Sequence, residues 1–110
     1  MKVLVVDDDP SIRSAVSLVL SIDDGVAEVR CAEGGADALR VVETFEADVV
    51  LMDYWMPEMD GSETARALRA HLPEARIVAY SGVLFDKPDW ADGFILKDRL
   101  PEAAELIPDD

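Results

Sequence analysis

VLVVDDDPSIRSAVSLVL, residues Val3 to Leu20, passes from a continuous apolar run through three aspartates into a segment with helical spacing. The run Val3 to Val6 has no alternation of apolar and polar residues, which is typical of a strand covered on both faces of a sheet. Asp9 can cap a helix and Pro10 suits its first turn. Apolar residues then recur at helical spacing: Ile12, Ala15, Val16, Val19 and Leu20. The stretch therefore predicts a buried strand that leads directly into an amphipathic helix.

The same order of strand and helix repeats along the chain. Further strands are expected at Val26 to Cys31, Val49 to Met52, Ile77 to Tyr80 and Phe94 to Leu96. A second helix is indicated by the apolar face of Ala38, Leu39, Val42 and Phe45. A third is indicated by Ala65, Leu68 and Leu72, and Pro73 ends it. A short last helix is expected over Pro101 to Ile107. This alternation predicts a doubly wound α/β domain with a five-stranded parallel sheet. Because no linker, repeat or low-complexity tract divides the 110 residues, we expect a single domain over 1–110 with no attached output domain.

Composition and charge argue against several classes of function. The formal net charge of −14 would repel a phosphate backbone, which argues against direct binding of DNA or RNA. No apolar run approaches the roughly 18 residues that span a membrane, and the N-terminal segment is too short and too acidic for a signal peptide. The lone cysteine, Cys31, cannot form an internal disulfide. A reducing, cytoplasmic location with no membrane contact is therefore expected.

Polar side chains follow the apolar runs where the predicted strands end. Asp7, Asp8 and Asp9 follow the first run, Asp53 the third, Ser81 the fourth and Lys97 the fifth. In an open parallel sheet, ligands bind beyond the carboxyl ends of the strands. If the strand order is the flavodoxin-like 2-1-3-4-5, then Asp7, Asp8 and Asp53 converge. Three carboxylates so close together must raise their pKa values or recruit a cation, and such hard oxygen ligands suit Mg²⁺. With a hydroxyl and an ammonium opposite, the site could cradle a phosphoryl group that Asp53 attacks as the nucleophile.

Four segments resemble the receiver domains of two-component response regulators: VLVVDDDPSIR, LMDYWMPEMDG, AYSG and FILKD. The resemblance covers residues 1–81 well and Ala91 to Lys97 adequately. It implies that Asp53 accepts phosphate from a phosphohistidine on a sensor kinase or phosphotransfer protein. It also implies that Asp8 and Asp53 bind Mg²⁺ directly, that Asp7 helps to hold it, and that the backbone carbonyl of Trp55 is a further metal ligand.

The same resemblance assigns three residues on the other side of the site. Ser81 matches the hydroxyl residue that moves to the phosphoryl group, Phe94 the aromatic switch residue and Lys97 the family's lysine. The implied output is a change in affinity for a downstream protein partner, and self-association as a homodimer is a further option.

Two features depart from the family pattern. Only 16 positions separate Ser81 from Lys97, and the segment 82–90 lacks helical periodicity and contains Pro88. The fourth helix is therefore expected to be shortened or missing. The family usually has proline after its lysine, whereas Asp98 follows Lys97 here, so the peptide bond between them is expected to be trans.

Other interpretations stay open at this point. Asp7 and Asp9 form a DxD that resembles the nucleophile motif of haloacid-dehalogenase-like phosphatases, although the chain has no room for a cap domain. The short fourth-helix region and Asp98 also suit a degenerate receiver that works unphosphorylated, as a binding module. Taken alone, Asp9 is most simply a helix cap.

Overall fold

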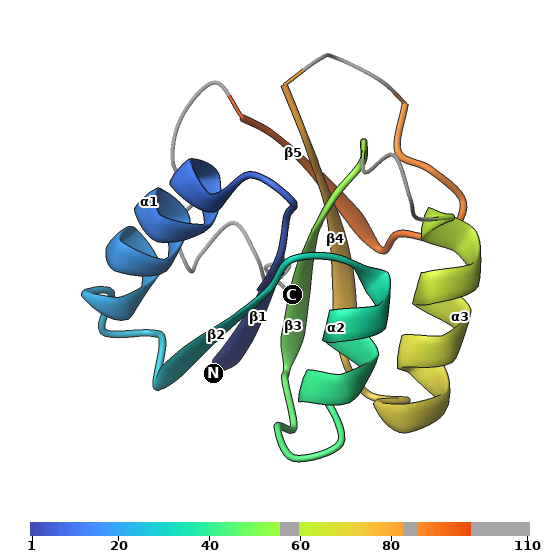
Figure 1. The fold of residues 1–110 in the computed structure, drawn as a ribbon, viewed down its shortest axis with the longest axis horizontal. Coiled ribbons are helices and arrows are strands. Elements are labelled where there is room, and N and C mark those ends of the chain that lie inside the picture. Colours follow the sequence, from blue (N-terminus) through green and yellow to red (C-terminus); the bar gives the residue numbers. More distant parts are fainter. Residues whose placement is uncertain (56–59, 83–85, 98–110) are drawn as a thin grey trace.

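The structure, a computed structural model of the chain, describes residues 1–55, 60–82 and 86–97. Five strands and three helices follow one another along this part of the chain: β1 (Lys2–Val6), α1 (Pro10–Ser21), β2 (Glu28–Ala32), α2 (Gly35–Val41), β3 (Val49–Asp53), α3 (Gly61–His71), β4 (Arg76–Ser81) and β5 (Gly93–Leu96). All strand pairs are parallel, in the order β2-β1-β3-β4-β5 (Figure 1). The predicted doubly wound α/β fold with flavodoxin-like strand order is confirmed.

Burial along each strand accounts for this order. Every residue of β3 is buried, as are the last four residues of β1 and the last five of β4. The outer strands β2 and β5 are more exposed. Continuous apolar runs therefore occupy the central strands, which helices cover on both faces, and the two edges carry mixed residues.

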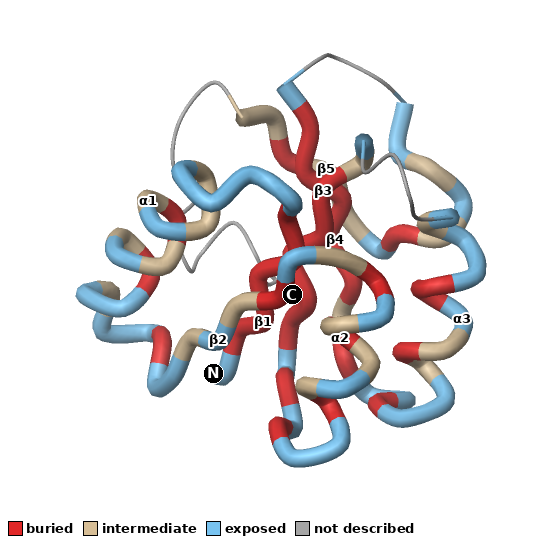
Figure 2. The backbone as a smooth tube through the Cα atoms, viewed as in Figure 1, coloured by how far each residue is buried: buried red, intermediate tan, exposed pale blue. Residues whose placement is uncertain are grey.

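Successive strand residues face two separate cores, one on each side of the sheet. Val5 of β1 belongs to the core beneath α1, together with Leu20 of that helix. Leu4 belongs to the core on the opposite face, together with Leu68 of α3 and residues of α2. Figure 2 shows the buried residues along the sheet and on the inner sides of the helices. Because each fully buried Leu or Val contributes on the order of 1.5–3 kcal/mol, the two cores hold the sheet firmly between the helices.

Two predicted element boundaries are wrong by more than one residue, for local reasons. The second strand begins at Glu28 instead of Val26, because the backbone N–H of Val26 donates to the carbonyl of Asp23 (3.0 Å) and closes a turn. The second helix ends at Val41. Thr44 then donates to the carbonyl of Val41 (3.1 Å) in a tighter turn, although Phe45 is buried as its spacing predicted.

The connection between β4 and β5 confirms the expected loss of the fourth helix. Its described residues, 82 and 86–92, contain no helix. The segment is instead attached to α3 by Arg69, whose Nη2 donates to the carbonyl of Trp90 (2.9 Å) and to Asp92 Oδ2 (3.2 Å). Asp92 Oδ2 also accepts from the backbone N–H of Ile77 in β4 (2.9 Å). Side-chain hydrogen bonds thus fix the described part of this connection, which contains no helix.

The predicted last helix, Pro101 to Ile107, lies outside the described residues and stays a prediction. Among the helices that are described, none is both long enough and apolar enough to cross a membrane.

Candidate functional site

The carboxyl ends of four neighbouring strands meet at one edge of the sheet. Asp7 directly follows β1, Asp53 and Ser81 are the last residues of β3 and β4, and Lys97 directly follows β5. The strand register brings these ends side by side, with Asp53 opposite Tyr80. Residues far apart in the sequence are therefore assembled into one site by the sheet, as predicted from the ends of the apolar runs.

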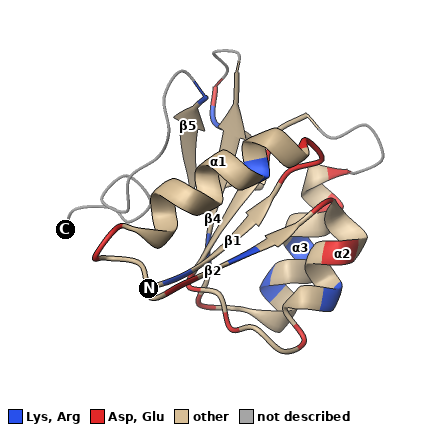
Figure 3. Ribbon diagram, turned by 60° about the vertical axis from the view of Figure 1, so that its left-hand side comes forward, with Lys and Arg blue, Asp and Glu red and all other residues tan. Residues whose placement is uncertain are grey.

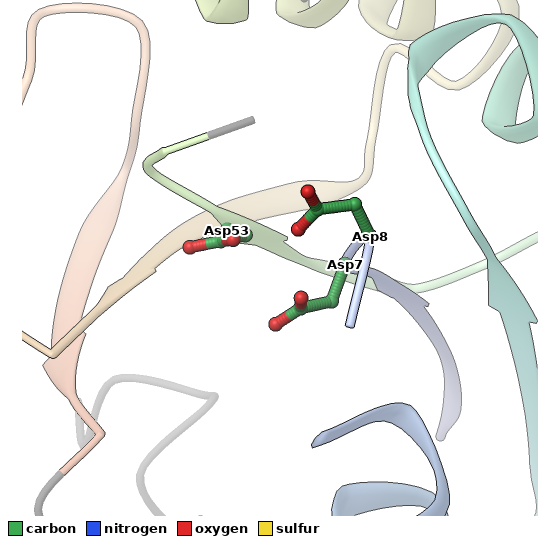
Figure 4. A group of neighbouring side chains, drawn as sticks. All are labelled: Asp7, Asp8 and Asp53. Carbon is green, nitrogen blue, oxygen red and sulfur yellow. The ribbon is translucent and has the colours of Figure 1, made fainter. Parts of the chain in front are cut away.

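Three carboxylates gather at this edge, and Figure 4 shows them turned toward a common space. Each of Asp7, Asp8 and Asp53 offers an oxygen within 4.8 Å of an oxygen of the other two. Asp7 and Asp53 are buried, with 1% and 7% of their surface exposed, whereas Asp8 is exposed. The cluster therefore has a closed inner side and an opening to solvent beside Asp8.

Lys97 closes the inner side of this cluster. Its Nζ lies 2.9 Å from Asp7 Oδ2 and 2.9 Å from Asp53 Oδ1. The ring of Tyr80 lies beneath the same ammonium, with its centroid 5.2 Å from Nζ, within range of a cation–π contact. The backbone N–H of Lys97 donates to the carbonyl of Ser81 (2.7 Å), which fixes the start of the side chain. Lys97 therefore points into the site. Asp98 lies outside the described residues, so the predicted trans bond is not tested.

Burial and neighbouring charges have opposing effects on the pKa values of Asp53 and Lys97. Burial raises the pKa of Asp53 above its usual 3.8, the hydrogen bond from Lys97 opposes this rise, and the neighbouring Asp7 carboxylate adds to it. Burial disfavours the charged form of Lys97, but hydrogen bonds to Asp53 and Asp7 outweigh this effect and raise the pKa of Lys97. The ammonium is therefore retained as a fixed positive charge facing two carboxylates.

The cluster fits a small divalent cation. In an octahedral Mg²⁺ shell with bonds of about 2.1 Å, neighbouring oxygens lie roughly 3 Å apart and opposite oxygens roughly 4 Å apart. One oxygen from each of the three carboxylates lies within 4.8 Å of the others, which is close to this spacing. Three carboxylates facing one ammonium also leave an excess of negative charge that a divalent ion would neutralise. Asp8 and Asp53 could bind the ion directly, with Asp7 behind them.

The loop between β1 and α1 is held by its own hydrogen bonds. The backbone N–H of Asp9 donates to Asp7 Oδ1 (2.9 Å), and Asp9 Oδ1 in turn accepts from the backbone of Ser11 (2.8 Å) and Ile12 (3.4 Å). Asp9 is thus the N-cap of α1, as the simplest interpretation of its position predicted. Arg13 Nη1 donates to the carbonyl oxygen of Asp7 (2.7 Å). The loop that carries two of the acidic residues is therefore fixed at both ends.

Ser81 lies at this edge and Trp55 just beyond it, whereas Phe94 lies two residues before the end of β5. The predicted roles of all three stay predictions. The backbone N–H of Trp55 donates to Asp53 Oδ1 (3.3 Å), and its side chain is 62% exposed. Ser81 is fully buried at the end of β4, next to the strand that carries Asp53. Phe94 is half-buried on β5, opposite Ala79.

Sequence reasoning missed two residues of the site, Arg13 and Tyr80. Arg13 is the only basic residue in α1, and Tyr80 directly precedes Ser81. These positions in the sequence could have drawn attention to both residues. Neither position indicates which atom the side chain contacts.

The fold and the site together define a class of protein: a doubly wound parallel α/β domain with an acidic cluster and a lysine at the carboxyl end of its sheet. The response regulator receiver domain is the family whose model matches this chain, over residues 3–99. The chain belongs to the response regulator receiver domain family.

Curated relatives agree with this family. The chain is 33% identical over 106 residues to the nitrate/nitrite response regulator protein NarL of Escherichia coli, a match that covers 91% of this chain and 49% of the relative. It is 37% identical over 106 residues to the probable transcriptional regulatory protein NarL of Mycobacterium tuberculosis, covering 89% of this chain and 48% of the relative. The chain thus spans about half the length of these relatives.

Solved structures show the same fold. The chemotaxis protein CheY4 of Vibrio cholerae superposes with a TM-score of 0.77 at 31% identity, covering 89% of this chain and 87% of that one. The response regulator protein TrrA of Thermotoga maritima, solved in complex with Mg(2+)-BeF, superposes with a TM-score of 0.75 at 31% identity, covering 88% and 86%.

Proposed function

We propose that this chain is a phosphoacceptor signalling domain in which Asp53 accepts a phosphoryl group from a phosphohistidine on a sensor histidine kinase or phosphotransfer protein. The observation that carries the proposal is the position of Asp53, which lies 2.9 Å from the Lys97 ammonium and within the same acidic cluster as Asp8. In the transfer, an oxygen of Asp53 bonds to phosphorus while the phosphorus–nitrogen bond of the phosphohistidine breaks. The histidine nitrogen leaves with the electron pair and takes up a proton.

The residues around Asp53 support this chemistry through position and charge. Lys97 and the hydroxyl of Ser81 are assigned to the oxygens of the phosphoryl group. Asp7, Asp8 and Asp53, with the backbone carbonyl of Trp55, are assigned to Mg²⁺. When bound, that ion would neutralise charge between the carboxylate and the phosphoryl oxygens.

The proposed output is a change in affinity for a protein partner. Ser81 and Phe94 would rearrange once Asp53 carries a phosphoryl group, and either a downstream protein or a second copy of the chain would bind the altered surface. In this role residues 1–110 act as one receiver domain in the cytoplasm. The domain would catalyse at most its own phosphorylation and dephosphorylation.

Intact-mass measurement tests the proposal. After incubation with Mg²⁺ and a small acyl-phosphate donor, the wild type should gain one phosphoryl group and Asp53→Asn should gain none. The same reaction with a chelator in place of Mg²⁺ should give little product. Equal labelling of the wild type and Asp53→Asn would rule out Asp53 as the acceptor.

A degenerate receiver that binds partners without phosphorylation is the second candidate. It is favoured by the attachment of the β4–β5 connection to α3 through Arg69, since a fixed connection has less freedom to respond to a phosphoryl group. This candidate predicts no mass gain in the wild type. The phosphatase alternative is disfavoured by the family match and because Asp9, the second aspartate of its DxD motif, caps α1.

A further inference from the structure

Arg13 joins the start of α1 to the end of β1. Its backbone N–H donates to the carbonyl of Asp9 (3.0 Å) in the first turn of the helix, and its guanidinium Nη1 donates to the carbonyl oxygen of Asp7 (2.7 Å). The side chain therefore reaches back across the whole loop that carries the acidic residues. A guanidinium suits this role because it is always charged and its planar head group is preorganised for hydrogen bonding.

The carbonyl that Arg13 contacts belongs to the peptide unit between Asp7 and Asp8. A peptide unit is planar and includes the Cα of the next residue. A hydrogen bond to the oxygen of this unit therefore restrains the position of the Asp8 Cα, from which the carboxylate side chain extends. Asp8 is exposed, so packing does little to orient it. Two further hydrogen bonds of the loop involve Asp7: its backbone N–H donates to the carbonyl of Ala32 (3.1 Å), and its Oδ1 accepts from the backbone of Asp9 (2.9 Å).

We infer that Arg13 is a positioning residue for the magnesium site. Its hydrogen bond to Asp7 holds the peptide unit so that the carboxylate of Asp8 faces Asp53, and loss of this bond weakens Mg²⁺ binding. The inference rests on the proposed function, since it concerns the ion that the proposed phosphoryl transfer requires.

The charge of Arg13 acts in the opposite direction from its hydrogen bond. A positive charge close to the cluster repels Mg²⁺, so removing that charge without disturbing the loop would tighten metal binding. Removing the hydrogen bond would loosen it, as is usual when an outer partner of a metal ligand is lost. The sign of the change in affinity therefore separates a positioning role from a simple charge effect.

Calorimetric titration of Mg²⁺ into the wild type, Arg13→Met and Arg66→Met provides the test. Methionine keeps an apolar stem but has no donor. Arg66 is an exposed residue of α3, so its replacement removes the same charge away from the loop. We expect Arg13→Met to raise the dissociation constant roughly tenfold, and Arg66→Met to leave it unchanged or slightly lower. Binding by Arg13→Met that equals or exceeds that of Arg66→Met would overturn the inference.

A second measurement excludes a merely structural role. Phosphoryl uptake by Arg13→Met from a small acyl phosphate should be slow at limiting Mg²⁺ and should return to the wild-type rate at saturating Mg²⁺. Uptake that stays slow at saturation, or a large loss of melting temperature without Mg²⁺, would show a folding defect and overturn the inference. If the wild type itself binds no Mg²⁺, the proposed function fails. If the wild type binds and both variants match it, only the role of Arg13 fails.

Discussion

Lys97 balances the two buried carboxylates that the sheet brings together. Its ammonium lies 2.9 Å from an oxygen of each, and its side chain is 17% exposed. A buried charge that loses its partner is costly, because the remaining charge is left in a poorly solvated place. One ammonium therefore faces two buried carboxylates, and the same ammonium is available to a phosphoryl group in the proposed function.

Replacing Lys97 by methionine should destabilise the fold at neutral pH by about 2–3 kcal/mol, somewhat less than for a fully enclosed pair, since the cluster opens to solvent at Asp8. Without Lys97, the pKa of Asp53 loses its main lowering influence and rises further. A carboxyl group whose pKa is higher in the folded state than its unfolded value of 3.8 stabilises the fold at pH values below 3.8. This stabilisation is lost as the pH rises through the pKa of the folded state. The deficit of Lys97→Met should therefore be largest near pH 7 and shrink as the pH falls toward 4.

Urea unfolding of Lys97→Met at several pH values, with and without Mg²⁺, measures this effect. Added Mg²⁺ should reduce the deficit, since a second cation can then face the carboxylates. Lys2→Met is the matched control, because Lys2 is exposed at the opposite end of β1. Equal stability of the two variants at pH 7 without Mg²⁺ would contradict the assigned role of Lys97.

At the scale of the elements, Trp90 joins the β4–β5 connection to the start of α3. The indole lies so close to Gly61, the first residue of α3, that a Cβ there would be 2.9 Å from Trp90 Cε2. Tyr54, which follows Asp53, stacks on the same indole with ring centroids 6.3 Å apart. An aromatic contact, together with the hydrogen bonds of Arg69, thus does the packing that a fourth helix would otherwise provide.

Gly61→Ala should therefore destabilise the protein by about 1–3 kcal/mol through overpacking. Helix propensity alone predicts the opposite sign, a gain of up to about 1 kcal/mol. Combining Gly61→Ala with Trp90→Leu should recover part of the loss in a double-mutant cycle of denaturation free energies. Gly82→Ala, where a Cβ would meet nothing within 4 Å, is the control and should change stability by less than about 0.5 kcal/mol. A stabilised Gly61→Ala would disprove the close contact.

The strands and the residues at their ends could be predicted from the sequence. The contacts that individual side chains make could not. The central strands are recognisable because burial on both faces demands an unbroken apolar run, and the positions of Asp53 and Lys97 follow from where such runs end. The end of α2 depended on a single tight turn at Thr44, which periodicity does not reveal. Arg13 was missed because its contact with Asp7 depends on the path of the loop between them.

Over the whole molecule, acidic residues outnumber basic ones by 24 to 10. Figure 3 shows acidic segments in the loops at both ends of the sheet, while the strands between them are mostly uncharged. Such a surface repels itself, and this repulsion weakens the compact state. The cluster of Asp7, Asp8 and Asp53 adds a local concentration of the same charge. Cations should therefore stabilise the fold in two ways, by general screening and by occupying the site.

These two effects can be separated by urea unfolding. Raising NaCl from about 0.01 M to about 0.1 M, which shortens the screening length from roughly 30 Å to 10 Å, should stabilise the wild type and Asp8→Asn by similar amounts. At a fixed ionic strength, Mg²⁺ at ten times its dissociation constant should add about 1.4 kcal/mol to the wild type, because it binds the folded state alone. Asp8→Asn should lose most of this addition, since Asp8 is one of the two residues assigned to direct contact with the ion. An equal gain from Mg²⁺ in both proteins would mean that the ion acts on the acidic surface as a whole and not at the carboxyl end of the sheet.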